Sequence, residues 1–176
     1  ENLGDALAHA DKINKKHKYT FVHPFDDPFT IAGQGTVGRE ILEDEIDYDA
    51  VFVPVGGGGL LAGISAWIRQ NKKKIKIIGV EVNDSACLTE ALIQNKRVYL
   101  KRVGLFADGV AVSQVGKNNL DVIKECVDEV MTVNSSVEDF IYEHKPYAVI
   151  KGKEHETLEN PEEEINKYKT GEKLKV

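Results

Sequence analysis

The sequence is poor in cysteine and has no long apolar run. Its two cysteines, Cys87 and Cys126, lie far apart and outside any Cys-x-x-Cys or Cys/His cluster. We therefore expect neither a disulfide framework nor a metal site, and the composition favours the reducing cytoplasm. The longest strongly apolar stretch, residues 60–68, is far shorter than the roughly 20 residues of a membrane helix. No membrane partner is expected.

An excess of basic charge is also lacking. Of 176 residues, 23 are Lys or Arg and 29 are Asp or Glu, which gives a net charge of −6. Proteins that bind nucleic acids normally carry a basic surface, so we expect no nucleic-acid partner. The one dense basic run, residues 72–74, closes a predicted helix, where cations are favourable. With 41% hydrophobic residues, a chain of this length can bury a core without metal or disulfide links.

The two ends of the sequence differ from its middle. Residue 1 is Glu rather than Met, and no signal peptide follows, so we do not expect residue 1 to be the natural start. Lys or Glu occupies half of the positions in residues 151–176. Such a segment cannot build a core. The sequence therefore predicts a folded segment over residues 1–145 and a divergent charged tail over residues 146–176.

Hydrophobic patterning predicts alternating helices and strands. Two nearly continuous apolar runs, residues 51–55 and 75–82, flank an amphipathic segment at 60–70, which predicts a strand, helix and strand with a parallel pairing. The fold class is therefore α/β. The other predicted helices are at 3–17, from an N-cap at Thr36, at 86–94, from an N-cap at Asn118 and from a capping box at 135–138; the other predicted strands are at 19–22, 97–100 and 130–133.

One local motif indicates chemistry. Four consecutive glycines, Gly56, Gly57, Gly58 and Gly59, stand between the predicted strand at 51–55 and the helix that begins near Leu60. Glycines permit a sharp turn and a close approach to the main chain, and the N–H groups at a helix start attract anions. Because four glycines cost backbone entropy without packing against anything, we favour phosphate binding over a simple tight turn.

The identity of the phosphate compound stays open from spacing alone. Residues 57–62 match the dinucleotide pattern Gly-x-Gly-x-x-Ala, and Glu81 ends the next strand near the place of a ribose-binding acid. A dinucleotide-binding dehydrogenase is therefore an alternative. A Walker A loop is excluded, since no Gly-Lys-Ser or Gly-Lys-Thr follows the glycines.

Several segments together resemble a known family. Residues 53–63 resemble the phosphate-binding segment of the fold-type II pyridoxal-phosphate enzymes, which include threonine ammonia-lyase and serine racemase. Residues 23–28 with 31–36 are similar to threonine and serine dehydratases in general. Residues 81–88 and 102–112 are more similar to biosynthetic threonine ammonia-lyase than to its catabolic relative. The motifs occur in the family's order.

The resemblance implies a fold, a cofactor and a reaction. The fold would be part of the large domain of such an enzyme, a three-layer α/β structure with a largely parallel twisted sheet. The cofactor would be pyridoxal phosphate, held by main-chain N–H groups of residues 56–59 and Leu60, with Gly109 lying against it. The enzyme would convert an amino acid substrate, L-threonine, to 2-oxobutanoate and ammonia in isoleucine biosynthesis. A homo-oligomer is expected.

Two departures from the family limit this interpretation. The Ser-Phe-Lys-x-Arg-Gly-Ala segment with the Schiff-base lysine and the substrate-binding Ser-x-Gly-Asn-His loop are absent, and the family pattern ends near Phe140. We therefore expect an inactive fragment, truncated or frameshifted, and assign no catalytic residue. A non-catalytic interaction module is a third hypothesis.

Four other polar residues are interpreted as structural. Glu81 would be a hydrogen-bonded residue at a strand end rather than a metal ligand, because Cys87 stands where a second carboxylate is expected. His23 would be a loop histidine near the edge of the cofactor domain. Asp26 and Asp27 would form a turn before the proline that follows.

Overall fold

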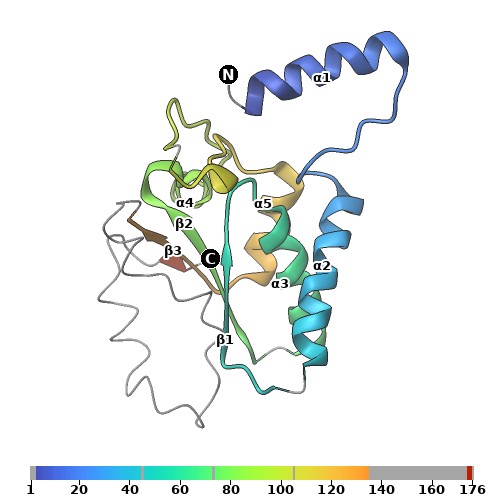
Figure 1. The fold of residues 1–176 in the computed structure, drawn as a ribbon. Coiled ribbons are helices and arrows are strands. Elements are labelled where there is room, and N and C mark those ends of the chain that lie inside the picture. Colours follow the sequence, from blue (N-terminus) through green and yellow to red (C-terminus); the bar gives the residue numbers. More distant parts are fainter. Residues whose placement is uncertain (1–2, 45, 73, 105, 135–173, 176) are drawn as a thin grey trace.

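The computed structural model describes residues 3–44, 46–72, 74–104, 106–134 and 174–175 (Figure 1). Its helices and strands follow the predicted alternation over most of the chain. In order they are α1 (Leu3–His17), α2 (Pro28–Glu43), β1 (Ala50–Pro54), α3 (Gly59–Asn71), β2 (Lys76–Val82), the short 3-10 helix η1 (Asn83–Ser85), α4 (Cys87–Ile93), a second 3-10 helix η2 (Asp108–Val110), α5 (Lys117–Cys126), β3 (Glu129–Val133) and β4 (Leu174–Lys175).

The sheet has the order β1-β2-β3-β4 and is largely parallel. β1 pairs with β2 in parallel, with Val53 opposite Gly79, and β2 pairs with β3 in the same sense, with Val80 opposite Met131. The two-residue β4 adds to β3 in the antiparallel direction. The strand, helix and strand predicted over 51–82 is confirmed, and with it the α/β fold class.

Helices α2, α3 and α5 stand together on one side of the sheet (Figure 1), and the core cluster joins side chains of these helices and the sheet with Cys87, Leu88 and Ala91 of α4. Val51 and Val53 of β1 and Val55, directly after the strand, are buried at alternate positions, while Phe52 and Pro54 are half-buried. The partial exposure follows from the place of β1 at the edge of the sheet, where a proline without an N–H is tolerated. Helical spacing brings Leu61 and Ile68 of α3 onto the same core.

Helices α2 and α3 approach each other through glycines. A Cβ on Gly63 of α3 would overlap the carbonyl oxygen of Ile31 and lie 2.7 Å from the main-chain nitrogen of Gly35, both in α2. A Cβ on Gly38 of α2 would lie 3.0 Å from the carbonyl oxygen of Ile64. Backbone therefore packs directly against backbone at this crossing.

The predicted start of the second helix was wrong. Asp27, not Thr36, is the N-cap of α2, and its side chain accepts hydrogen bonds from the N–H groups of Phe29 at 2.9 Å and Thr30 at 3.2 Å. Pro28 at the first helical position favours this earlier start, since its fixed φ suits a helix and its missing N–H needs no partner there. Thr36 lies inside the helix, where its hydroxyl donates to the carbonyl of Gly33 at 2.8 Å.

Two predicted strands are not strands. Residues 19–22 are an extended connection, because no described strand lies beside them to accept their main-chain hydrogen bonds. Residues 97–100 form a loop held by its neighbour, in which Arg97 donates to the carbonyl of Val115 at 2.8 Å and Leu100 donates to that of Ser113 at 2.8 Å. The helix predicted from 135–138, and the charged tail apart from β4, lie outside the described residues.

Four of the exposed large apolar side chains lie on α1 and in the segment after it: Ile13, Tyr19, Phe21 and Val22. Ile13 is 41% exposed, Tyr19 64% and Val22 70%. Figure 1 shows α1 standing apart from the other helices. Within the described part of the chain, no helix is long and apolar enough to cross a bilayer.

We expect this chain to self-associate, since large apolar side chains left in water favour association. Light scattering after size exclusion, across a micromolar concentration series, should show mass rising towards a dimer. The double variant Tyr19→Ser, Val22→Ser should shift the equilibrium towards monomer while leaving the core intact. A wild type that stays monomeric at every concentration would contradict the expectation.

Candidate functional site

The four glycines lie where the sheet meets α3. β1 ends at Pro54, the N–H of Val55 makes a last bond to the carbonyl of Val80 at 2.8 Å, and α3 begins at Gly59. Gly58 is the N-cap and has a φ of 89°, a left-handed conformation that side chains disfavour. Because β1 and β2 are parallel, this turn lies at the carboxyl end of both strands, the usual place of ligands in α/β folds.

The hydrogens of these glycines face protein. A Cβ on Gly57 would overlap the ring of Phe25, and one on Gly59 would lie 2.8 Å from the carbonyl oxygen of Phe25. A Cβ on Gly56 would lie 3.1 Å from Cα of Val110. Our premise that the glycines pack against nothing was therefore wrong: close packing explains part of the need for glycine here, independently of any ligand.

The carbonyl groups of the loop are anchored. Gly57 O accepts from the side-chain amide Nδ2 of Asn119 at 2.7 Å and from the N–H of Gly116 at 3.0 Å. Gly56 O accepts from the thiol of Cys87 at 3.5 Å. Burial, with the charge of Glu81 second, raises the pKa of Cys87 to about 12, so the thiol keeps the proton that it donates.

The main-chain N–H groups of the loop differ from its carbonyl groups in their hydrogen bonding. Within the described part of the chain, no hydrogen bond has its donor among the main-chain N–H groups of residues 56–60. These groups coincide with the positive end of the α3 dipole. The loop therefore presents the donors that an anion requires.

Asp26 and Asp27 do more than form a turn. While Asp27 caps α2, Asp26 accepts from the N–H groups of Lys117 and Asn118, each at 2.8 Å, at the start of α5. α5 thus begins at Lys117, and Asn118 is not its N-cap as predicted. An Asp directly before Pro28 could have indicated the first cap; the second joins residues about 90 positions apart in sequence and gave no local signal.

His23 is the loop histidine that the sequence predicts. Its Nδ1 accepts from the N–H of Asp26 at 2.9 Å, and its ring lies edge-on to that of Phe25, with centroids 4.7 Å apart. This turn holds Phe25 against the glycine loop.

Glu81 is confirmed as a hydrogen-bonded residue at a strand end. Its side chain is fully buried, and its carboxylate accepts from the N–H of Leu88 at 2.8 Å, the N–H of Thr89 at 2.7 Å and the hydroxyl of Thr89 at 2.7 Å. It caps α4 and is not available to a ribose. Of the two observations behind the dinucleotide alternative, the one on Glu81 therefore does not hold, while the Gly-x-Gly-x-x-Ala match at residues 57–62 remains.

The stability of the protein should depend on pH through Glu81. Burial raises the pKa of this carboxyl to about 6, against the opposing hydrogen bonds from Thr89 and Leu88. The pKa of Glu81 is higher in the folded protein than in the unfolded chain. Its contribution to the free energy of unfolding is therefore fully present below about pH 4.5 and is lost as pH rises through 6. Relative to Glu81→Gln, the wild type should lose about 2 kcal/mol of unfolding free energy across this window. Urea unfolding of both proteins at several pH values checks this prediction. The same dependence of the unfolding free energy on pH in both proteins would contradict it.

Comparison with known proteins decides the family. Residues 1–137 match the family model described as "Pyridoxal-phosphate dependent enzyme". The chain belongs to this family. The resemblance seen in the sequence motifs is thereby confirmed, as is the assignment to fold-type II.

Individual members of the pyridoxal-phosphate-dependent family agree with the match. The biosynthetic L-threonine dehydratase of Burkholderia multivorans is 48% identical over 136 residues, which are 77% of this chain and 27% of that protein. The mitochondrial threonine dehydratase of Schizosaccharomyces pombe is 44% identical over 76% of this chain and 22% of that protein. The processed threonine deaminase isoform 2 of Solanum lycopersicum superposes with a TM-score of 0.72 and 39% identity, over 81% of this chain and 43% of that one. The chain spans about a quarter of the curated relatives.

The residues present fit the phosphate of the family's cofactor. The unengaged N–H groups of residues 56–60 are the donors that such a group needs. Gly109 lies in η2, next to Val110, whose Cα would lie 3.1 Å from a Cβ on Gly56. The structure thus brings Gly109 into the neighbourhood of the loop. Within the described part of the chain, a Cβ on Gly109 would meet no atom within 4 Å, so none of the described groups requires a glycine there.

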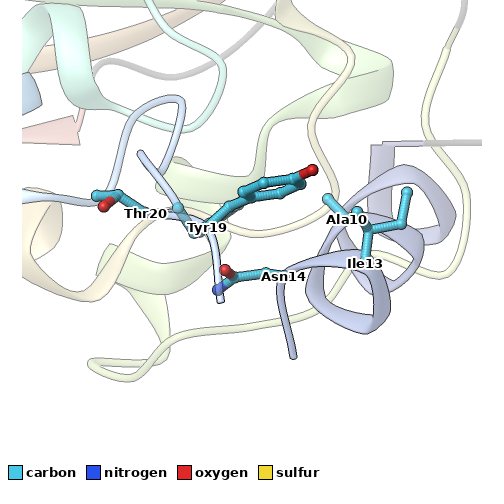
Figure 2. A pocket seen from close by; sticks show the side chains of 6 residues that line it. Ala10, Ile13, Asn14, Tyr19 and Thr20 are labelled. Carbon is cyan, nitrogen blue, oxygen red and sulfur yellow. The ribbon is translucent and has the colours of Figure 1, made fainter. Parts of the chain in front are cut away.

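One hollow of the described surface lies away from the glycine loop. It has a volume of about 240 Å³ and lies between α1 and the segment after it, lined by Ala10, Ile13, Asn14, Tyr19, Thr20 and Phe21 (Figure 2). Its walls are mainly apolar and contain no charged side chain. It is a poor site for a phosphate, and none of the predicted site residues borders it.

Proposed function

We propose that this chain is part of the catalytic domain of a threonine ammonia-lyase, and that residues 56–60 bind the phosphate of pyridoxal phosphate through main-chain N–H groups. The enzyme would convert L-threonine to 2-oxobutanoate and ammonia, as a cytoplasmic homo-oligomer in isoleucine biosynthesis. The support is the set of unengaged N–H groups at the start of α3, in a chain whose relatives are named threonine dehydratases.

The residues of this chain would act on the cofactor by binding and orientation. The N–H groups of the loop and the dipole of α3 oppose the phosphate charge, and the fixed carbonyls of Gly56 and Gly57 keep the loop rigid. Pyridoxal phosphate, when bound, supplies the electron sink for removal of the α-proton and departure of the β-hydroxyl. Gly109 would leave room beside the cofactor. Within this sequence no residue is assigned to carry the proton.

The proposal is tested by nuclear magnetic resonance of the main-chain amides. Pyridoxal phosphate and inorganic phosphate should shift the amide signals of Gly56, Gly57, Gly58, Gly59 and Leu60. Pyridoxal, which has no phosphate, should bind about tenfold more weakly or worse, since it lacks the charge-assisted bonds. Tighter binding of NAD would favour a dehydrogenase. No response to any phosphate compound would overturn the proposal and favour an interaction module.

Gly109→Ala tests the second part of the site. Because nothing lies within 4 Å of the added Cβ, the variant should fold with unchanged stability. If Gly109 lies against the cofactor, the methyl group should weaken pyridoxal phosphate binding severalfold and leave inorganic phosphate binding unchanged. Gly33→Ala, at another glycine with open space around it, is the matched control. A Gly57 variant would be uninformative, since its Cβ would displace Phe25 whether or not a ligand binds there.

A further inference from the structure

Asn119 is a buried polar residue beside the glycine loop that the proposed function does not yet use. It lies in the first turns of α5, and its side chain is completely buried. Its Nδ2 donates to the carbonyl of Gly57 at 2.7 Å, a short bond between residues that lie 62 positions apart in the sequence. The bond ties α5 to the loop.

The other polar atom of the Asn119 side chain is its amide oxygen, Oδ1. This oxygen is buried and has no hydrogen-bond partner within the described part of the chain. A Cβ at Gly58 would lie 3.1 Å from Cδ1 of Ile123 and 3.2 Å from both Cβ of Asn119 and Cγ2 of Val115, so the surroundings are partly apolar. Burying an amide whose oxygen lacks a partner lowers the free energy of unfolding. The presence of Asn119 is therefore better explained by what its hydrogen bond does for the loop.

The bond fixes the direction of an N–H group. In a planar trans peptide the C=O and the N–H point in opposite directions, so a carbonyl of Gly57 that points to α5 turns the N–H of Gly58 away from α5. Between two glycines a peptide plane rotates easily, since neither residue has a Cβ to limit it. The N–H of Gly116 also anchors this carbonyl, at 3.0 Å, so the plane is held by two donors.

We propose that Asn119 is a positioning residue for the phosphate site, which holds the Gly57–Gly58 peptide so that the N–H of Gly58 faces the anion. The inference rests on the proposed function, because it concerns the same loop. It adds a specific side chain, on a different helix, to a site otherwise built from main chain.

The test compares Asn119→Leu with Asn118→Ala. Leucine has a similar size and removes the donor and the unpartnered oxygen together, while Gly116 still bonds to Gly57, so the fold should survive. Asn119→Ala, which is smaller and cannot overlap its neighbours, is measured alongside. Asn118 is exposed, and its side chain donates to the carbonyl of Asp26 rather than to a carbonyl of the loop, so its replacement is the control.

The readout is the ratio of the affinities for pyridoxal phosphate and pyridoxal, together with the amide signal of Gly58 in ligand-free protein. Both Asn119 variants should lower the ratio about tenfold and move the Gly58 signal, with thermal unfolding near that of the wild type. Asn118→Ala should change neither. Unchanged ratios in folded Asn119 variants, with a wild type that binds phosphate, would overturn the role of Asn119 alone. A wild type that binds no phosphate would overturn both proposals.

Discussion

Replacing Gly63 with alanine is expected to lower the free energy of unfolding by about 3 kcal/mol or more. The added Cβ would overlap the carbonyl of Ile31 and lie 2.7 Å from the nitrogen of Gly35, which are backbone atoms of α2 and cannot turn aside as a side chain can. Helices α2 and α3 would have to separate, and both contribute to the buried core. Urea unfolding followed by circular dichroism measures the loss.

Gly33→Ala is the control for this prediction. Gly33 lies in α2 near the same crossing, but it is exposed and nothing lies within 4 Å of an added Cβ. Alanine there should raise the unfolding free energy by roughly 0.5 to 1 kcal/mol through helix propensity. Equal effects of the two substitutions would show that the helices do not approach at Gly63 as described.

The sequence predicted those elements whose signals are local. The apolar runs at β1 and β2 and the helical spacing of α3 and α5 specify element type directly, and these elements appeared within one or two residues of the predicted bounds. Residues 19–22 have the composition of a strand but no described strand beside them. A strand needs a partner, and composition does not show whether one is present.

The position of the glycine loop was predictable from the sequence, but the residues that support the loop were not. Four glycines between a strand and a helix indicate an anion site from sequence alone, because the main-chain N–H groups that favour an anion all lie within one turn. The contacts of Phe25, Asp26 and Asn119 with the loop and with α5 are long-range, and their positions carry no pattern that points there. The close packing of the glycines against protein was missed for the same reason.

A protein consisting of residues 1–176 is expected to produce no 2-oxobutanoate from L-threonine above the rate of free pyridoxal phosphate. The reaction requires a lysine that holds the cofactor covalently and exchanges with the substrate amine. The family's Ser-Phe-Lys-x-Arg-Gly-Ala segment does not occur in these residues, and neither does the Ser-x-Gly-Asn-His loop that would hold the substrate. The proposed phosphate site uses neither segment, so we expect cofactor binding and turnover to separate.

Two measurements on one preparation decide this. Amide signals of residues 56–60 should respond to pyridoxal phosphate, while 2-oxobutanoate formation stays at the cofactor-only level. Borohydride reduction followed by peptide mass mapping should label no single lysine in preference to the others, since none of them is placed by a family motif. Saturable turnover well above the control, together with selective labelling of one lysine, would show that this chain supplies the missing group from elsewhere in its sequence. Turnover would then disappear on replacing that lysine with arginine, which keeps the charge but forms no Schiff base with the cofactor.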